Sequence, residues 1–295
     1  MMFDAIQGVD GDPIVYVNGE FLPLSRASIS VLDRGFIFGD GIYEVVPIYH
    51  GQPFRMKEHL DRLERSLAKI DIAPPMARAK WEQLFAELLS KQDVLACAMI
   101  YLQVTRGVAK RDHAYPNPPV KPTVFAMVTP MSPPSEAVRT RGLTAISIPD
   151  ERWLHCDIKS VSLLGNVLAK QAAVKARVDE VVQFRDGYLT EGASCNIWVV
   201  ESGMVYAPPK DNLVLEGIRY GLFEELCRDN GISFALEPVT QERVSTASEL
   251  LMSSATKEVL PIVELDGKPI GSGSPGPVYR QLRQAYDRRI AALGN

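Results

Sequence analysis

The fold of this chain is indicated most clearly by two short stretches, CDIKS at residues 156–160 and TEGASCN at residues 190–196. The first places Lys159 just before an apolar, helix-like run, and the second places Glu191 at the start of a strand-like run. A lysine amine can form an imine with an aldehyde, and a carboxylate can keep the nitrogen of an aromatic ring protonated. Together the two residues predict chemistry carried out on an aldehyde-bearing ring.

The composition is that of an ordinary globular protein. With 295 residues the chain exceeds the size of a usual single core, so we expect two domains. Apolar residues make up 46% and charged residues 23%, as in most soluble proteins. Lys and Arg number 32 and Asp and Glu 36, which gives a net charge of −4. This charge gives no reason to expect nucleic acid or a membrane as a partner.

Targeting and metal signals are absent from the sequence. The first residues, MMFDAIQ, lack the basic and apolar regions of a signal peptide, and no apolar run reaches the ~20 residues needed to span a bilayer. The cysteines show no metal-ligand spacing and are typical of reduced thiols. They are Cys97, Cys156, Cys195 and Cys227. We therefore expect a cytoplasmic protein without a metal site.

A proline-rich polar stretch, TPMSPPS at residues 129–135, predicts a break between two packed regions. We predict a smaller N-terminal α+β domain over residues 1–130, a linker over residues 131–137 and a larger C-terminal domain over residues 138–295. The overall class is thus α/β, of the α+β kind, with two domains.

The N-terminal part mixes strands with helices. Residues 14–21 predict a hairpin that turns at Asn18-Gly19, and residues 42–48 and 99–105 predict further strands. Two apolar stripes at helical spacing predict two helices. The stripes are Leu60, Leu63, Leu67 and Ile70, and Trp81, Leu84, Phe85 and Leu88.

The C-terminal part predicts many short strands with separate helices. The strands are expected at residues 143–148, 180–184, 196–200, 204–207, 250–253 and 262–265. The helices are expected at residues 162–176, 215–226 and 278–293, and the first of them carries Leu163, Val167 and Val174 on one face. This pattern favours a barrel-like or mixed sheet.

Further stretches occur in an order and spacing that resemble a known family. They are DRGFIFGDGIYEVV at 33–46, EHLDRL at 58–63, VTRG at 104–107, RDH at 111–113, RWLHCDIKS at 152–160, TEGASCN at 190–196 and LEGI at 215–218. Over roughly residues 25–265 the chain resembles the fold-type IV pyridoxal phosphate enzymes, and most closely the D-amino acid aminotransferases. The resemblance implies two α/β domains, pyridoxal 5′-phosphate in the cleft between them, and a homodimer.

The resemblance also implies roles for individual residues. Lys159 would form the imine with the cofactor and then move the proton between the substrate Cα and the cofactor C4′, while Glu191 would face the pyridine nitrogen. Arg62 and the start of the helix at Gly217 would bind the phosphate, because a guanidinium and a helix N-terminus both suit an anion. The implied cofactor-binding residues are Lys159, Glu191, Arg62, Ser194, Leu215, Gly217, Ile218, Arg219, Ser254 and Ala255. His59, three residues before Arg62, is expected to support it structurally.

Two positions depart from the family pattern near the phosphate. A small hydroxyl residue followed by a basic one is common after Ile218, where this chain has Arg219-Tyr220. Ala255 stands where a hydroxyl donor is frequent. Two hydroxyl contacts would be missing, so Arg219 either replaces them with its charge or points away and leaves the cofactor less tightly held.

Three residues match the positions at which D-amino acid aminotransferases bind the substrate α-carboxylate: Tyr43, Arg111 and His113. An arginine and a histidine two residues apart in an extended segment project to the same side and can converge on one carboxylate. Taken alone, KRDH at residues 110–113 is a charged loop. L-specific branched-chain enzymes of this fold do not usually carry the Arg-x-His pair, so the resemblance favours D-amino acids.

The implied activity is that of a D-amino acid transaminase with a ping-pong mechanism. It would move the amino group of D-alanine-like donors to 2-oxo acids such as 2-oxoglutarate or pyruvate. Two alternatives share the fold and the lysine: an L-branched-chain amino acid aminotransferase and 4-amino-4-deoxychorismate lyase, which eliminates pyruvate without an acceptor. A third is a scaffold that binds no cofactor. The expected partners are small amino acid and 2-oxo acid substrates and a second copy of the chain.

Overall fold

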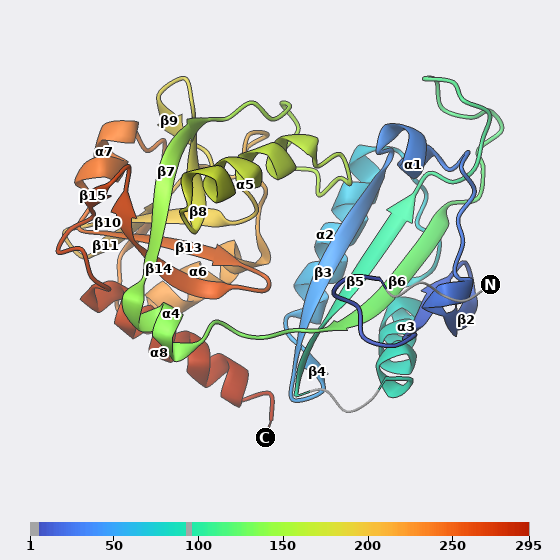
Figure 1. Ribbon diagram of the computed structural model, residues 1–295, viewed down its shortest axis with the longest axis horizontal. Coiled ribbons are helices and arrows are strands. Elements are labelled where there is room, and N and C mark those ends of the chain that lie inside the picture. The colour runs from blue at the N-terminus through green and yellow to red at the C-terminus, as the bar shows by residue number, and fades with distance from the viewer. Residues whose placement is uncertain (1–5, 93–95, 295) are drawn as a thin grey trace. The chain divides into compact units, whose positions relative to one another are not determined.

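The computed structural model describes residues 6–92 and 96–294. The chain splits into two compact units (Figure 1). Unit 1 comprises Met1–Met131 together with Lys159–Ser162, and unit 2 comprises Ser132–Ile158 together with Leu163–Asn295. The segment that carries Lys159 therefore belongs to unit 1, although the residues on both sides of it belong to unit 2.

Unit 1 is built on a six-stranded antiparallel sheet in the order β2-β1-β6-β5-β3-β4. Its strands are β1 (Ile14–Val17), β2 (Glu20–Pro23), β3 (Gly41–Tyr49), β4 (Gln52–Pro53), β5 (Cys97–Thr105) and β6 (Thr123–Pro130). Its helices are α1 (Arg34–Phe38), α2 (Met56–Lys69) and α3 (Arg78–Ser90), with a 3-10 turn at Leu24–Arg26. The predicted hairpin is confirmed, and its turn residues Asn18 and Gly19 have φ of 52° and 111°.

The core of unit 1 lies between this sheet and the helices α2 and α3. In β3, Ile42, Glu44 and Val46 are buried, whereas Tyr43 and Val45 between them are partly exposed. Alternation follows from the period of two along a strand, so Tyr43 projects from the opposite face to Glu44. The predicted apolar stripes are buried except at Ile70, which is partly exposed and follows the end of α2. The buried members are Leu60, Leu63 and Leu67, and Trp81, Leu84, Phe85 and Leu88.

The short helix α1 is fixed at both ends. The side chain of Asp33 accepts a hydrogen bond from the N–H of Gly35 at 2.8 Å, which caps the start of the helix. Gly39 ends it in the left-handed conformation with φ of 67°. A Cβ on Gly35 would lie 2.2 Å from Cγ2 of Thr105, so only glycine allows α1 to approach β5 this closely.

Unit 2 is built on a mixed, curled sheet of nine strands in the order β12-β11-β10-β13-β14-β7-β8-β9, with β15 paired to β14 (Figure 1). The strands are β7 (Leu143–Pro149), β8 (Glu180–Arg185), β9 (Tyr188–Leu189), β10 (Asn196–Glu201), β11 (Met204–Ala207), β12 (Phe234–Leu236), β13 (Glu249–Ser254), β14 (Glu258–Leu265) and β15 (Lys268–Pro269). The helices are α4 (Glu136–Arg141), α5 (Leu164–Ala176), α6 (Ile218–Asp229), α7 (Gln241–Thr246) and α8 (Pro277–Ala291). Parallel pairs join β7 to β8 and β14, and β11 to β12. The predicted α+β class and mixed sheet are confirmed.

Helix α5 packs against β7 and β8, while α6 and α8 pack against β13. The predicted apolar face of α5 is not the face that packs. Small residues, Ala169 and Ala173, are buried against the sheet, whereas Val167 and Val174 are exposed. The small alanine side chains allow α5 to approach the strands closely. The larger apolar side chains of α5 point outward.

Several elements differ from the sequence-based expectations, and the short elements α1, α7, β4, β9, β12 and β15 were not predicted. Helix α6 begins at Ile218, with Gly217 as N-cap, and not at residue 215. Strand β6 was not predicted, yet it lies between β1 and β5 and extends to Pro130, inside the proline-rich stretch. Helix α4 begins at Glu136, inside the predicted linker, because Ser135 caps it. Pairing on both sides supports β6 in spite of its terminal proline, which needs no ladder N–H.

Among the described residues, no helix is both long and apolar enough to cross a membrane. The cysteines Cys97, Cys156, Cys195 and Cys227 carry free thiols, and all but Cys97 are buried.

Asp33 offers a test of how α1 is held. Besides capping α1, its carboxylate accepts from the hydroxyls of Thr105 at 3.0 Å and Thr123 at 2.6 Å. We expect Asp33→Ala to lower the free energy of unfolding by about 2–4 kcal/mol, because a cap is lost and two buried hydroxyls lose their acceptor. Ser135→Ala, at the exposed N-cap of α4, should cost about 1 kcal/mol or less. Urea unfolding measures both, and equal losses would contradict the role of Asp33.

Candidate functional site

Lys159 and Tyr43 lie together in unit 1. The backbone N–H of Tyr43 donates to the carbonyl of Lys159 at 3.0 Å, and the N–H of Val161 donates to Gly41 at 3.0 Å. This short antiparallel contact holds the segment 159–162 along the edge of β3. The Lys159 Nζ lies 4.0 Å from the centroid of the Tyr43 ring, and Lys159 is half-buried. The structure thus brings together one predicted catalytic residue and one predicted carboxylate-binding residue.

A second aromatic ring, which the sequence did not single out, supports Tyr43. The Tyr101 ring stacks on Tyr43 with centroids 5.8 Å apart, and its hydroxyl donates to Gln103 at 2.7 Å. Burial, together with the neighbouring Tyr43, raises the pKa of Tyr101 to about 12. Tyr101 therefore stays neutral. Its ring packs on Tyr43 while its hydroxyl remains a hydrogen-bond donor.

Arg62 lies in α2 and is bound to a buried carboxylate. Glu44 accepts from Arg62 Nε at 2.7 Å and from its Nη2 at 2.8 Å, and the ring of His59 contacts the same carboxylate at 2.7 Å. Burial opposes ionisation of Glu44, but Arg62 and His59 outweigh it and hold the pKa of Glu44 well below its usual range. The two-pronged contact fixes the plane of the Arg62 guanidinium. His59 thus supports Arg62 indirectly, through Glu44.

Arg111 and His113 lie on the β5–β6 loop, residues 106–122, which is largely exposed and irregular. Both side chains lie against the ring of Phe38. The Arg111 Cζ is 5.4 Å from the ring centroid, and the His113 ring is also 5.4 Å from it, tilted by 42°. Both side chains therefore contact the same aromatic ring, although their loop is irregular and is not the extended segment that the sequence predicted.

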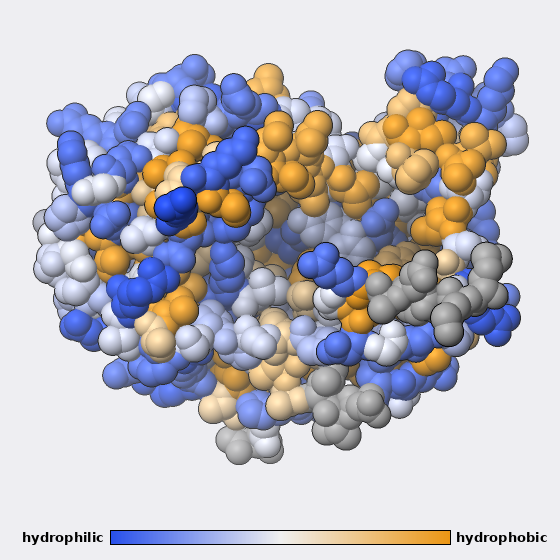
Figure 2. All heavy atoms as spheres, viewed as in Figure 1, coloured by the Kyte–Doolittle hydropathy of each residue, from blue (hydrophilic) through white to orange (hydrophobic). Residues whose placement is uncertain are grey.

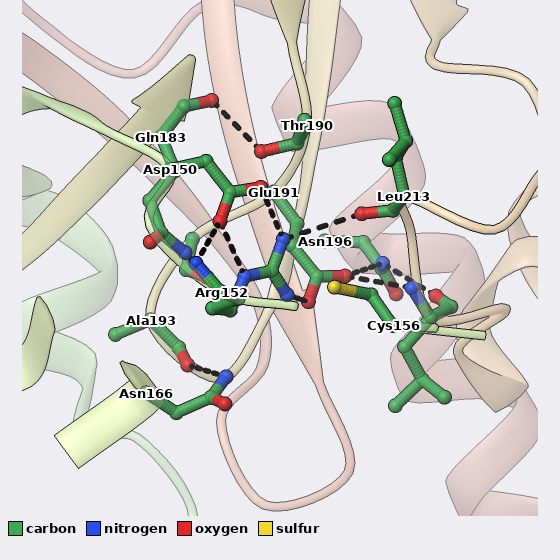
Figure 3. Close-up of polar contacts among 12 residues, drawn as sticks. Asp150, Arg152, Cys156, Asn166, Gln183, Thr190, Glu191, Ala193, Asn196 and Leu213 are labelled. Atoms are coloured by element: carbon green, nitrogen blue, oxygen red, sulfur yellow. Dashed lines mark hydrogen bonds and ion pairs between the residues drawn. The ribbon is translucent and has the colours of Figure 1, made fainter. Parts of the chain in front are cut away.

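In unit 2, Glu191 is the end of a row of buried charges (Figure 3). Its Oε1 accepts from Nη1 of Arg152. The same guanidinium binds Asp150 through Nε at 2.9 Å and Nη2 at 2.8 Å, and Arg185 contacts Asp150 at 3.2 Å. The side chains of Arg152, Asp150 and Glu191 are 5%, 0% and 6% exposed. Positive and negative groups thus alternate from Arg185 to Glu191, and each buried charge has a partner.

The protonation of Glu191 reflects two opposing effects. Burial raises its pKa above the usual value, and Arg152 and the N–H of Leu215 partly offset this rise. That N–H donates to Glu191 Oε2 at 3.0 Å, and Asn196 Nδ2 contacts the same oxygen at 3.4 Å. For Asp150 burial is outweighed by Arg152, so its pKa is lowered. Of the two carboxylates in this row, Glu191 is consequently the one that is more easily protonated.

The loop that carries Glu191 has little freedom. Gln183 donates to the carbonyl of Gly192 at 2.8 Å. Asn166 in α5 donates to the carbonyl of Ala193 at 2.8 Å (Figure 3). A Cβ on Gly192 would lie 2.3 Å from the sulfur of Cys195, so glycine is required there. Ser194, also predicted as a cofactor-binding residue, is exposed in this loop.

The predicted phosphate-binding helix begins beside the same loop. Among the described residues no side chain caps the start of α6 at Gly217, and no acidic residue lies in its first turn. Asn196 donates to the carbonyl of Leu215 at 3.0 Å, and its Oδ1 would lie 2.0 Å from a Cβ on Gly217. Asn196 thus connects Glu191 to the N-terminus of α6, whose first N–H groups and dipole suit an anion.

Arg219 turns toward the protein interior. It is 1% exposed, its Nη2 donates to the carbonyl of Ala255 at 3.0 Å, and its guanidinium lies 5.3 Å from the centroid of the Tyr286 ring. The Ala255 turn is held on its other side by Ser254, whose hydroxyl accepts from the N–H of Lys257 at 3.0 Å. Arg219 therefore connects the first turn of α6 to the loop that contains Ser254 and Ala255.

Several functional candidates were missed from the sequence because their partners are distant along the chain. Glu44, Asp150 and Arg152 were present in or beside the motifs, but nothing in their local pattern shows which charge each one binds. The spacing Asp150-x-Arg152 beside a buried strand was the available signal, since a buried charge requires a partner.

Comparison with known proteins supports the resemblance found in the sequence. The model of the amino-transferase class IV family matches residues 41–265. The D-alanine aminotransferase of Staphylococcus epidermidis strain RP62A is 40% identical over 276 residues, which cover 94% of this chain and 97% of that protein. The corresponding protein of Bacillus licheniformis is 38% identical over 279 residues, which cover 94% and 96%.

Solved structures show the same fold. A branched-chain amino acid aminotransferase from T.th., solved with pyridoxamine 5′-phosphate, has a TM-score of 0.87 at 26% identity and covers 96% of this chain and 95% of that one. The Escherichia coli branched-chain enzyme has a TM-score of 0.88 at 22% identity, with 94% of each chain covered. The fold-type IV prediction is therefore confirmed.

The pair of Arg152 and Glu191 can be tested in the cofactor-free protein. We expect Arg152→Met to lower the free energy of unfolding by about 3–5 kcal/mol, because it leaves the buried Glu191 without a cationic partner and leaves Asp150 with Arg185 alone. Arg141→Met removes a guanidinium from an exposed pair with Asp179, at 54% exposure, and should cost less than about 1 kcal/mol. Urea unfolding at neutral pH measures both, and similar small losses would contradict the pairing.

The free energy of unfolding that Arg152→Met loses should depend on pH, which provides a second prediction. Without Arg152 the folded-state pKa of Glu191 rises further above its unfolded value. A raised carboxyl pKa contributes stability at low pH that is lost as the pH rises through the folded-state value. The deficit of Arg152→Met relative to wild type should therefore be smaller at about pH 5 than at about pH 8. A deficit that grows on acidification would contradict this assignment.

Proposed function

Because this chain belongs to the class IV aminotransferase family, we propose that it is a D-amino acid transaminase, which moves the amino group of D-alanine-like donors to 2-oxo acids such as 2-oxoglutarate and pyruvate. The observation that carries the proposal is the 40% identity, over 94% of the chain, with a relative named D-alanine aminotransferase. The contact of both Arg111 and His113 with the ring of Phe38 keeps the two side chains near each other and supports the same substrate class.

The residues present fit pyridoxal 5′-phosphate as cofactor. When bound, this group supplies an aldehyde and an electron-accepting ring. The start of α6 has no capping side chain and no acidic first-turn residue among the described residues, which suits a phosphate. Glu191 is a buried carboxylate that a protonated ring nitrogen would complement, and its raised pKa reflects burial that such a cation would relieve.

Each candidate residue then has a defined task. The Lys159 Nζ would hold the cofactor covalently and, once released by the substrate amine, take the proton from the substrate Cα. Glu191 would keep the ring nitrogen protonated, with Arg152 fixing the orientation of its carboxylate. Tyr43, Arg111 and His113 would bind the substrate α-carboxylate by a hydroxyl, a guanidinium and an imidazole.

Two segments would share the phosphate. One is the start of α6 with Gly217, Ile218 and the preceding Leu215, and the other is the turn of Ser254 and Ala255. Arg62, fixed by Glu44, would add a guanidinium. Arg219 is directed at the Ala255 carbonyl, so we propose that it compensates for the missing hydroxyls by holding the turn in place.

A second candidate is an L-branched-chain aminotransferase. The similar solved structures described above are enzymes of that name, with TM-scores of 0.87 and 0.88. Their identities of 26% and 22% are well below the 40% of the D-alanine aminotransferase relative. We therefore prefer the D-amino acid assignment.

We further propose that the protein acts as a homodimer in the cytoplasm and that units 1 and 2 correspond to its two domains. Helix α5 carries a row of apolar side chains that the described residues leave exposed (Figure 2). Leu164, Val167 and Leu168 are 71%, 59% and 60% exposed, which is unusual for a helix that faces water. A second copy of the chain would cover them.

A half-reaction separates the two candidate functions. We expect D-alanine, added without an acceptor to the holoprotein, to abolish the visible absorbance of the bound cofactor and release one equivalent of pyruvate, while L-leucine has no effect. Lys159→Ala should give no such response, and Lys170→Ala, in α5, should respond as wild type does. A response to L-leucine alone would contradict the proposal. No response to either amino acid, with the visible absorbance intact, would instead favour the lyase, which releases pyruvate from 4-amino-4-deoxychorismate without an acceptor.

Arg219 can be tested through cofactor affinity. We expect Arg219→Met to raise the cofactor dissociation constant about tenfold, since one charged hydrogen bond to the Ala255 carbonyl is worth about 1.5–3 kcal/mol and part of it is expressed in binding. Arg219→Lys should have a smaller effect. Equilibrium titration of the apo-protein measures the constant, and a value unchanged in Arg219→Met would exclude the compensating role.

A further inference from the structure

The β5–β6 loop carries the two residues that would bind the substrate carboxylate, yet it contains almost no regular structure of its own. Apart from a single bridge between Val108 and Asp33, it makes no strand pairing in the part of the chain that the structure describes. Arg111 and His113 are both exposed in it. An exposed irregular loop would sample many conformations, and ordering it on binding would weaken substrate affinity. Something outside the loop must hold it.

The guanidinium of Arg34 does this through the loop backbone. Its Nη1 donates to the carbonyls of Asp112 at 2.5 Å and Ala114 at 3.3 Å, and its Nη2 contacts the carbonyl of His113 at 3.4 Å. One side chain thus binds three consecutive carbonyls, and these include the residue between Arg111 and His113. The Arg34 side chain is 4% exposed, so these bonds are made with little competition from water.

Arg34 is itself fixed from two directions. It is the first residue of α1, which Asp33 caps, and its Nε donates to Asp40 at 2.7 Å. Asp40 also binds Arg106, through Nε at 2.7 Å and Nη2 at 3.0 Å. The Arg106 guanidinium lies 3.5 Å from the centroid of the Tyr115 ring, which belongs to the same loop. Two guanidinium groups sharing one carboxylate therefore contact both ends of the segment 112–115.

Phe38, at the other end of α1, contacts the side chains of the loop. Its ring lies 4.8 Å from the Arg34 Cζ and 5.4 Å from both the Arg111 guanidinium and the His113 ring. Arg34 thus holds the backbone of the loop, while Phe38 provides a common surface for the two side chains that the loop presents.

We propose that Arg34 is a positioning residue for substrate recognition: by binding the carbonyls of residues 112–114, and with Phe38 as a platform, it holds Arg111 and His113 in the geometry that receives the substrate carboxylate. This inference rests on the proposed transaminase function. Arg34 touches neither substrate nor cofactor in this role. Arg34 keeps the loop ordered before the substrate binds, so that binding does not have to order it. Its effect is therefore on substrate binding and not on the proton transfer at Lys159.

The test compares Arg34→Lys with Arg26→Lys in the holoprotein. Lysine retains a charge for Asp40, but its ammonium on a flexible stem cannot reproduce the planar contact with three carbonyls. Arg26 is exposed in the 3-10 turn of the same unit and makes the matched control. We expect Arg34→Lys to raise KM for D-alanine and for 2-oxoglutarate about tenfold to a hundredfold, with kcat changed less than about threefold.

Hydrogen exchange provides the readout that does not depend on activity. Amides of residues 108–116 should exchange about tenfold faster in Arg34→Lys than in wild type, while those of β5 stay unchanged. Phe38→Leu should raise KM in the same direction with a smaller change in exchange, because it removes the platform and leaves the backbone contacts. The cofactor absorbance should be the same in all of these variants.

The proposal would be overturned by unchanged exchange in the loop of Arg34→Lys, or by a fall in kcat with KM unchanged. Loss of bound cofactor together with faster exchange throughout unit 1 would also overturn it, since Arg34 would then serve the stability of the whole unit. If wild type transfers no amino group from any D-amino acid, the proposed function fails. The exchange comparison still decides whether Arg34 positions the loop.

Discussion

A buried charge needs a partner, and near the candidate functional residues arginine meets that requirement in three clusters. Arg152 binds Glu191 and Asp150, Arg62 binds Glu44, and Arg34 and Arg106 share Asp40. An unpaired carboxylate at any of these places would cost several kcal/mol or become protonated. Glu191 and Arg62 are members of these ion pairs, and Arg111 and His113 lie on the loop that Arg34 contacts, so the ion pairs fix part of the geometry in which the chemistry is proposed to occur.

The three clusters differ in what they make possible. At Glu44 the pair is strong enough to lower the pKa of the carboxyl, and its consequence is a fixed Arg62. At Glu191 burial prevails and the pKa stays raised, which leaves a carboxylate that gains from a further cation. Asp40 binds Arg34, and the remaining donors of Arg34 bind carbonyls of the β5–β6 loop. This ion pair therefore acts on the loop indirectly, through Arg34. One kind of interaction, the buried ion pair, thus fixes Arg62, leaves Glu191 suited to a further cation and holds the β5–β6 loop.

Sequence patterns predicted the local features well. The Asn18-Gly19 hairpin and the stripes of α2 and α3 depend on short-range periodicity, and the structure contains them. Features that depend on distant partners were not predicted. Strand β6 is supported by β1 and β5, and the exposed apolar face of α5 results from the small residues that face the sheet.

The candidate site divides in the same way. Lys159, Glu191 and the start of α6 could be proposed from their motifs, and the structure places Glu191 and the start of α6 around Asn196. The residues that hold them, above all Arg152 and Arg34, could not be assigned, because a charged residue in a loop looks the same whether it binds water or a buried carboxylate. Only the folded chain brings Arg34 beside residues 112–114.

The proposed function depends above all on Lys159 as the residue that holds the cofactor. Reduction of the holoprotein with borohydride, followed by proteolysis and mass spectrometry, tests it most directly. We predict that the mass of the reduced cofactor is found on the peptide that contains Lys159, at one equivalent per chain. Its appearance on another lysine, such as Lys170 or Lys257, or on no lysine in a protein that had bound the cofactor, would contradict the claim.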